Sequence, residues 1–242
     1  MGKYLKLFDT HTDYNTYITG QNKILPNVSY CENENEVHYN PWVETMVVAK
    51  FNVTSTSSAT TICAGLSPNI SKMYVDGVEQ SSTSTTFTFD TIGEHSIKYE
   101  LIDDTTIGNG AFANCTSLTS ITIPNSVTTI GTEVFRGCIS LTNVTIPNSV
   151  TFIDGGVFYN CIGLTSVTIG NSVTSIGIQL FNGCRILESV TIKATNPPEL
   201  TWDNDMFVNS TNCPIYVPSE SVEAYKTAQY WSTYASRIQA IP

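Results

Sequence analysis

The sequence predicts a mainly β protein with short helices, whose centre is a solenoid of four 23-residue repeats. Three observations predict it: a fixed repeat period, a short alternating strand pattern in each repeat, and a turn signal after each strand. Six positions recur every 23 residues: Ile107, Ile130, Ile153 and Ile176; Phe112, Phe135, Phe158 and Phe181; Cys115, Cys138, Cys161 and Cys184; Leu118, Leu141, Leu164 and Leu187; Ile121, Val144, Val167 and Val190; Ile123, Ile146, Ile169 and Ile192. Four copies exceed the minimum of about three that such an array needs to bury a continuous core.

Each repeat is expected to form one coil. In "SLTSITIP", Ile121 and Ile123 alternate with Ser120 and Thr122, which indicates a strand with one buried face. "PNSV" at 124–127 then turns the chain, because Pro fixes φ and Asn can hydrogen-bond to its own backbone. The "GxxxFxxC" segment predicts a tight helical or 3₁₀ turn that places Phe and Cys inward. Such a coil is held only by its neighbours.

The full pattern, I-G-x-x-x-F-x-x-C-x-x-L-T-x-[IV]-T-I-P-N-S-V-T, resembles the BspA-type leucine-rich repeats of bacterial surface proteins over residues 107–195. The resemblance implies a leucine-rich repeat solenoid and adhesion to host matrix proteins or to other bacteria. In the fourth repeat "IKATNPPEL" replaces "IPNSVTTI", so we expect the array to end there. The leading segment is similar to those of proteins from gut Bacteroidales and their phages.

The sequence divides into four parts. Residues 104–195 hold the repeats, and residues 196–242 predict a C-terminal cap with a strand at 214–218 and a helix over 220–229 that Ser219 would N-cap. Residues 44–103 predict a small immunoglobulin-like β domain, a sandwich of about five strands that would also cover the N-terminal end of the solenoid. Asp76-Gly77 is its hairpin signal.

Residues 1–43 predict a short N-terminal α+β unit. "KYLKLF" favours a strand, and a capping box from Thr10 to Asp13 followed by Gly20 favours a helix over "YNTYIT". "PNVSYCENENEVHYNP" predicts a hairpin with an acidic turn. No apolar signal region opens the chain, so we expect either that a signal was removed or that the protein does not use that route.

Composition excludes two classes of partner. The chain carries 11 Lys and Arg against 21 Asp and Glu, a formal net charge of −10, which disfavours nucleic acid and anionic membrane. No stretch approaches the roughly 18 apolar residues of a membrane span, so no membrane insertion is expected. With the resemblance, this predicts an extracellular, cell-surface or virion protein.

The cysteines and histidines do not predict a catalytic or metal site. No CxxC or HxxxH pattern occurs, and the four ladder cysteines are expected to be buried small hydrophobes rather than disulfides or metal ligands. The state of Cys31, Cys63 and Cys213 stays open. None of the three histidines, His11, His38 and His95, lies in the repeats, and the alternating position of His95 predicts an exposed side chain.

The carboxylates predict no catalytic pair. Glu32, Glu34 and Glu36 would share one strand face and suggest calcium, although a solvated acidic turn is the favoured interpretation. Asp203 and Asp205 are expected to cap a turn. Glycoside hydrolysis needs two converging carboxyl groups, whereas the repeats offer Glu133, Asp154 and Glu188 on different sides of the coil. The sequence therefore predicts no enzyme activity, no cofactor and no metal.

The outward face of the repeat strands is the candidate binding surface. Two rows of small polar residues are expected on it: Ser120, Asn143, Ser166 and Ser189, and Thr122, Thr145, Thr168 and Thr191. One interpretation is structural, since β-branched hydroxyl residues favour strands and hydrogen-bond across coils. The other is a flat polar surface, without Trp, Tyr or Arg anchors, that binds weakly and repeatedly.

Two functions follow from this surface. The first is a non-enzymatic adhesion module displayed on a cell or phage, recognising a host matrix protein, a glycan or a bacterial surface component through the solenoid. The alternative is a structural spacer or virion component anchored through residues 1–43. The identity of the ligand and the oligomeric state stay open.

Overall fold

The computed structural model describes residues 28–31, 36–39, 46–64, 70–81, 83–201, 205–210 and 212–242, and the chain forms two compact units, residues 1–46 and 47–242. In the first unit, β1 (Val28–Cys31) pairs antiparallel with β2 (Glu36–Tyr39), which confirms the predicted hairpin. The expected strand, capping box and Gly20 helix stop, the acidic-turn residues Glu32 and Glu34, His11 and Asp203 lie outside the described residues. So do the side chains of Cys31, Glu36 and His38.

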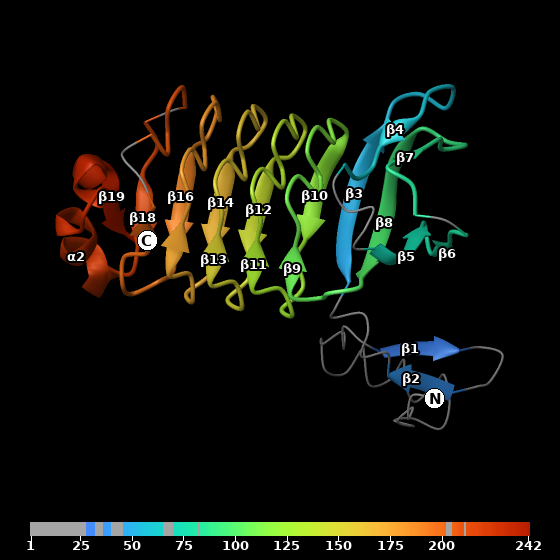
Figure 1. Cartoon of the computed structure of the whole chain (residues 1–242), viewed down its shortest axis with the longest axis horizontal. Helices are drawn as coiled ribbons and strands as arrows, with labels where there is room; N and C mark the ends of the chain where they lie inside the picture. Colours follow the sequence, from blue (N-terminus) through green and yellow to red (C-terminus); the bar gives the residue numbers. More distant parts are fainter. Residues whose placement is uncertain are drawn as a thin grey trace. The chain divides into compact units, whose positions relative to one another are not determined.

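The second unit begins with a five-stranded antiparallel sheet in the order β10-β3-β8-β5-β6 (Figure 1). Its strands are β3 (Val47–Val53), β5 (Ile70–Val75), β6 (Val78–Glu79), β8 (Gly93–Leu101) and β10 (Leu118–Thr122). A separate antiparallel pair joins β4 (Thr60–Thr61) to β7 (Thr86–Phe87). Strands β3 and β8 alternate buried residues with half-buried or exposed ones, as expected for a sheet with one face on a core.

This N-terminal sheet includes a strand of the first repeat. In β10, Ser120 pairs with Lys50 and Thr122 pairs with Val48 of β3, so the sheet runs across residue 103. The Tyr99 ring of β8 also contacts the Phe112 ring edge-on, with centroids 5.5 Å apart. The sheet thus covers the N-terminal end of the repeat core. The domain boundary at residue 103 and the immunoglobulin-like description stay proposals.

The β5–β6 hairpin turns at the predicted dipeptide. Asp76 and Gly77 have φ values of 49° and 85°, the left-handed pair that a two-residue type I′ turn needs. The Asp76 carboxylate also accepts hydrogen bonds from the Ser96 N–H (2.9 Å) and from Nδ1 of His95 (2.7 Å). The side chain of Asp76 therefore fastens the hairpin to β8.

The expectation that His95 is exposed is wrong, because its ring is only 8% exposed. Nδ1 faces the Asp76 carboxylate, and Nε2 lies 2.9 Å from the Thr91 carbonyl oxygen. Both oxygens accept hydrogen bonds, so only the protonated ring satisfies both contacts. The hydrogen bond with Asp76 raises the pKa of His95 above its ordinary value, against the opposing effect of burial.

The repeats form two parallel sheets whose strands lie side by side from coil to coil (Figure 1). The short-strand sheet contains β9 (Thr106–Ile107), β11 (Thr129–Ile130), β13 (Phe152–Ile153), β15 (Ser175–Ile176) and β17 (Glu199–Leu200). The long-strand sheet contains β12 (Asn143–Ile146), β14 (Ser166–Ile169), β16 (Ser189–Ile192), β18 (Ile215–Val217) and β19 (Ile238–Ala240). Between β12, β14 and β16 the partners are 23 residues apart, which confirms the register read from the sequence.

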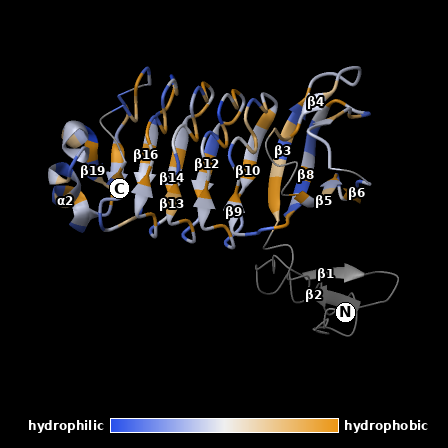
Figure 2. Cartoon of the chain, viewed as in Figure 1, coloured by the Kyte–Doolittle hydropathy of each residue, from blue (hydrophilic) through white to orange (hydrophobic). Residues whose placement is uncertain are grey.

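Each coil buries the same set of side chains, and hydrophobic segments recur from coil to coil (Figure 2). The recurring phenylalanines form one stack, with ring centroids 5.3–5.8 Å apart and interplanar angles of 3–25°; its members are Phe112, Phe135, Phe158, Phe181 and Phe207. Tyr99 closes the stack edge-on at one end and Tyr234 closes it at the other. The segment around each Phe forms consecutive turns, which matches the predicted tight turn without extending to a regular helix.

The ladder cysteines are buried thiols, as predicted. Cys115, Cys138, Cys161 and Cys184 have no exposed surface, and burial raises the pKa of Cys138 and Cys184 to about 12. The thiols of Cys138 and Cys161 each donate to the carbonyl of the phenylalanine in the preceding coil, Phe112 and Phe135, at 3.0 and 2.9 Å. A small hydrophobe with one weak donor fits this position because it satisfies that carbonyl inside the core.

The array continues past residue 195, contrary to the expectation. β17 pairs in parallel with β15, and β18 pairs in parallel with β16. The repeat period lengthens here, because Leu200 follows Ile176 by 24 residues and Phe207 follows Phe181 by 26. The changed spacing hides this coil from a strict 23-residue comparison.

The C-terminal segment covers the last coil. A 3₁₀ turn (Ser219–Ser221) leads into α2 (Val222–Thr227), and a second 3₁₀ segment (Trp231–Arg237) leads into β19. The α-helix is shorter than the predicted 220–229, and the Ser219 hydroxyl contacts Glu220 instead of capping it.

Two buried polar groups attach this cap to the solenoid. The Tyr225 hydroxyl donates to the Ala194 carbonyl at 2.8 Å, and the Trp231 indole N–H donates to the Pro198 carbonyl at 2.7 Å. Each bond ends on the backbone of the coil beneath the cap. The lid expected from the sequence is therefore present, and one residue within α2 and one after it anchor the lid.

Truncating one rung of the core should destabilise the protein strongly. Leu141 has no exposed surface and lies between Leu118 and Leu164, so we expect Leu141→Ala to lower the free energy of unfolding by about 2–5 kcal/mol. The matched control is Ile139→Ala in the same coil, whose side chain is 43% exposed and whose loss should cost about 0.5 kcal/mol or less. Chemical denaturation measures both, and equal midpoints for the two variants would contradict the proposed packing.

The buried histidine should make stability depend on pH. Because the folded-state pKa of His95 is raised, its contribution is complete below the ordinary pKa of about 6.5 and is lost as pH rises through the folded-state value. We expect the melting temperature of the wild type to fall across that window and His95→Gln to remove this component. Thermal melts from about pH 6 to about pH 9 measure it. Parallel curves for the two proteins would rule out the His95–Asp76 interaction as its source.

Candidate functional site

The long-strand sheet brings six of the eight predicted face residues together. Strand register places Asn143, Ser166 and Ser189 in one row and Thr145, Thr168 and Thr191 in a second row. We call these six residues the polar face. Asn143 and Thr145 are exposed and the other four are half-buried. Ser120 and Thr122 do not continue these rows by strand pairing, because β10 pairs with β3 instead of β12.

The two rows of the polar face differ in how their side chains are used. In the first row, the Ser166 hydroxyl lies 2.5 Å from Oδ1 of Asn143, so this pair is bonded across coils. Among the described residues, the hydroxyls of Thr145, Thr168 and Thr191 form no side-chain hydrogen bond. The threonine row therefore presents three hydroxyl groups that a ligand can engage as donors or acceptors.

Sequence reasoning missed an aromatic residue on this face. Tyr216 of β18 pairs with Thr191, which extends the threonine row by one coil, and its side chain is half-buried. The missed signal was "PIYVP", whose alternation aligns with "SVTIK" of the preceding coil once the longer spacing is allowed. Tyr216 thus adds one aromatic residue beside the polar face, and tyrosine is a type that dominates recognition surfaces.

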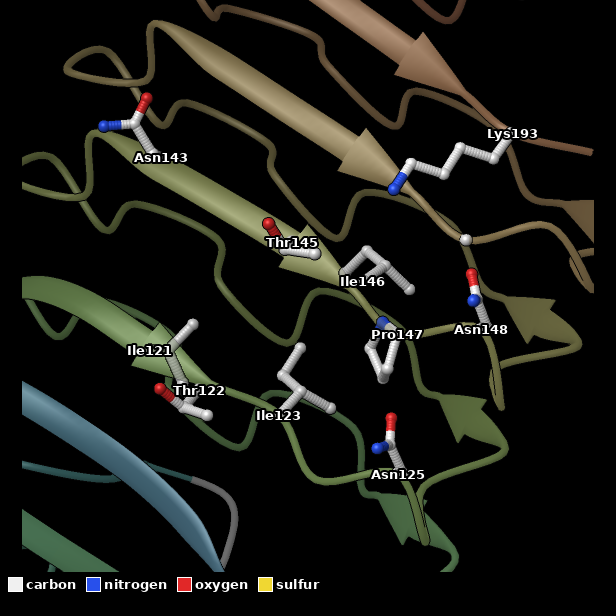
Figure 3. A pocket seen from close by; sticks show the side chains of 11 residues that line it. Ile121, Thr122, Ile123, Asn125, Asn143, Thr145, Ile146, Pro147, Asn148 and Lys193 are labelled. Atoms are coloured by element: carbon white, nitrogen blue, oxygen red, sulfur yellow. The ribbon is translucent and has the colours of Figure 1, made fainter. Parts of the chain in front are cut away.

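The long-strand sheet begins at β12, and a hollow lies where it stops (Figure 3). β10 and β12 belong to consecutive coils, yet each is the terminal strand of its own sheet, and no backbone hydrogen bond joins them in this described stretch. The hollow measures about 480 Å³. Its lining residues are Ile121, Thr122, Ile123, Asn125, Asn143, Thr145, Ile146, Pro147, Asn148, Gly170 and Lys193.

The pairing of β10 with β3 explains this break. The Asn52 N–H bonds to the Ser117 carbonyl and the Thr119 hydroxyl bonds to the Lys50 carbonyl, so the start of β10 is held by the N-terminal sheet. Directly before β12, the Thr142 carbonyl accepts from the Ser166 N–H, so the backbone groups of the alternate residues Asn143 and Thr145 face β10. Their backbone N–H and C=O groups therefore line the open edge.

The hollow gathers three of the predicted face residues, Thr122, Asn143 and Thr145, and adds groups that the sequence did not single out. Asn125, Asn148 and Lys193 come from the turns that follow the strands. The repeat pattern marked these turns as structural only. Two smaller hollows, of about 320 and 250 Å³, lie beside the C-terminal cap and between the turns of residues 171–174 and 194–197, and neither contains a polar-face residue.

Two of the three carboxylates that the repeats offer, those of Glu133 and Asp154, are engaged in local contacts, whereas that of Glu188 forms no side-chain hydrogen bond or ion pair with a described residue. Glu133 pairs with Arg136 at 3.2 Å, and Asp154 accepts hydrogen bonds from the Thr132 hydroxyl and the Gly155 N–H at 2.8 and 2.7 Å. Gln179 donates to Asp205 at 3.0 Å. In the part of the chain that the structure describes, no group of three His, Cys, Asp or Glu residues could hold a metal ion.

The comparison with protein-family models agrees with this architecture. Residues 105–233 match the family model described as the BspA type leucine rich repeat region, in six copies. A crystal structure of a leucine-rich repeat protein from T. pallidum is similar at 24% identity and a TM-score of 0.43, and the match covers 49% of this chain and 53% of that one. This chain thus matches only about half the length of that protein. No curated protein matches.

The family model spans more than half of the chain, including the coil after residue 195 that the strict 23-residue pattern did not extend to. Repeat regions of this kind are generally non-enzymatic interaction or adhesion modules and are typically surface-associated. Among the described residues, no helix has the length and apolar character that crossing a membrane requires. The chain belongs to the BspA-type leucine-rich repeat family.

Proposed function

We propose that this protein is a non-enzymatic adhesion module, displayed on a cell or phage surface, that recognises a protein or glycan through the polar face. The observation that carries the proposal is the register of that face: identical or similar small polar side chains stand directly beside one another on β12, β14 and β16. Solenoids typically present such extended faces to their partners.

The chemistry of the face suits a polar, repetitive ligand. Hydroxyl and amide groups both donate and accept hydrogen bonds, so they match hydroxyl-rich or amide-rich surfaces alike. Tyr216 adds one aromatic contact at the C-terminal end of the threonine row. Because few anchors are present, each site should bind weakly, and several copies on one surface would supply avidity. An origin in gut Bacteroidales or their phages fits such a role and is part of the proposal.

The test presents the full-length chain in multivalent form to gut bacterial cells, mucin, fibronectin, fibrinogen and purified polysaccharides. We expect saturable binding to one class of ligand and its loss in Thr168→Glu, because that residue lies at the centre of the threonine row. The matched control is Thr116→Glu, an exposed turn residue outside both parallel sheets. Biolayer interferometry measures the response, and circular dichroism verifies folding.

Two outcomes would contradict the proposal. Equal binding by Thr168→Glu, Thr116→Glu and the wild type would place the contact elsewhere on the chain. No binding to any ligand by folded protein would favour the alternative, a spacer or virion component anchored through residues 1–43.

A further inference from the structure

We propose that the hollow between β10 and β12 binds a saccharide that carries a carboxylate group, with Lys193 as the partner of that carboxylate. The inference rests on the proposed function and names its ligand class. It also places this ligand beside the polar face, in the hollow where Gly170 and Lys193 depart from the repeat and where the long-strand sheet stops at β12.

Two residues at the hollow depart from the repeat pattern. The position that follows each strand is Pro124 and Pro147 in the first two coils, but Gly170 and Lys193 in the next two. A Cβ atom on Gly170 would lie 2.5 Å from the Pro147 carbonyl oxygen, so this close approach requires glycine. Lys193 extends from the end of β16 back across the end of β14 toward β12 (Figure 3). Gly170 and Lys193, which stand where the earlier coils have proline, both line the hollow, and Lys193 brings a cation to it.

The hollow carries a single positive charge. Lys193 is the one charged residue among those lining the hollow, all of which the structure describes, in a chain whose formal net charge is −10. Among the described residues, Lys50 pairs with Glu94 at 2.7 Å and Arg136 with Glu133 at 3.2 Å, whereas Lys98 and Arg185 form no ion pair. No described carboxylate lies within ion-pair distance of Lys193. An anionic group on a ligand would supply the missing partner.

The space between β10 and β12 limits which ligands can enter the hollow. Inserting a peptide strand would require β10 and β12 to stand about 9.6 Å apart, twice the normal strand spacing. The same two coils are tied together at β9–β11 by parallel pairing and at Phe112–Phe135 by ring stacking at 5.8 Å. Because these contacts hold the two coils at the ordinary repeat spacing, β10 and β12 cannot separate far enough to admit an inserted strand. Small groups that donate and accept, such as sugar hydroxyls, can reach the open backbone edge at Asn143 and Thr145.

The lining of the hollow combines amide and apolar side chains. Asn125 and Asn148 offer side-chain amide N–H groups, whereas the amide of Asn143 is already bonded to neighbouring hydroxyls. Ile121, Ile146 and Pro147 form an apolar base suited to the C–H face of a sugar ring. A volume of about 480 Å³ lies within the usual range of small-ligand sites. Amides, an apolar base and one cation together match an acidic sugar better than a neutral sugar or a purely anionic group.

The experiment titrates the full-length protein with two acidic saccharides and their neutral counterparts: trigalacturonate against its methyl ester, and sialyllactose against lactose. NMR shift changes or calorimetry report binding at low salt. We expect at least one acidic saccharide to bind and its neutral counterpart to bind about tenfold more weakly or not at all. Lys193→Met should weaken the acidic ligand by about tenfold, and added salt should do the same.

The matched control is Lys72→Met, which removes the same charge from β5 in the N-terminal sheet and should leave binding unchanged. Equal affinity of Lys193→Met and the wild type, equal affinity for acid and ester, or equally tight binding of a tetraglutamate peptide would overturn the inference. Failure of every acidic saccharide overturns it too. The proposed function survives that result if Thr168→Glu still abolishes binding to another member of the ligand panel.

Discussion

Every coil of this solenoid has to present the same apolar edge to the next one, and the rest of the structure depends on that constraint. The phenylalanine stack shows how narrowly it is met, since four successive ring separations lie within 5.3–5.8 Å. The thiols of Cys138, Cys161 and Cys184 each donate to the phenylalanine carbonyl of the preceding coil, at 2.9–3.1 Å. Because a coil buries its core only against its neighbours, the outward side chains are free to vary without loss of the fold. Recognition can therefore be built on the polar face and the turns.

The constraint also requires that both ends of the stack be closed. At the C-terminal end the cap places Tyr234 against Phe207 and anchors Tyr225 and Trp231 to backbone carbonyls. At the N-terminal end Tyr99 covers Phe112 and β3 takes β10 as its partner. That second closure has a consequence for the long-strand sheet, because β10 joins the N-terminal sheet and leaves β12 as a terminal strand. The hollow beside Asn143 and Thr145 thus results from the pairing of β10 with the N-terminal sheet, and Gly170 and Lys193 contribute to its lining.

The repeat core was predictable because its signal is local and periodic: Ile107 to Ile192 keep one register, and strands β12, β14 and β16 follow it residue for residue. What the sequence did not reveal depends on partners that are distant or on a changed period. Tyr216 was missed because the last coil has longer spacing. Ser120 and Thr122 were assigned to the wrong sheet because their partners in β3 come about 70 residues earlier, where no periodic signal links them. His95 shares its strand face with the buried Ile97 and Tyr99, so the alternation of β8 itself places it inward, where its ring packs on Phe89 and bonds to Asp76.

The break between β10 and β12 is the central claim, and backbone amide hydrogen exchange tests it most directly. The N–H groups of Asn143 and Thr145 face the open edge, whereas those of Ser166 and Thr168, at the same positions one coil later, face the carbonyls of β12. The account predicts that the amides of Asn143 and Thr145 exchange markedly faster than those of Ser166 and Thr168 in the folded protein. Equal protection of the two pairs would show that β10 and β12 are hydrogen-bonded, and it would contradict both the break and the hollow.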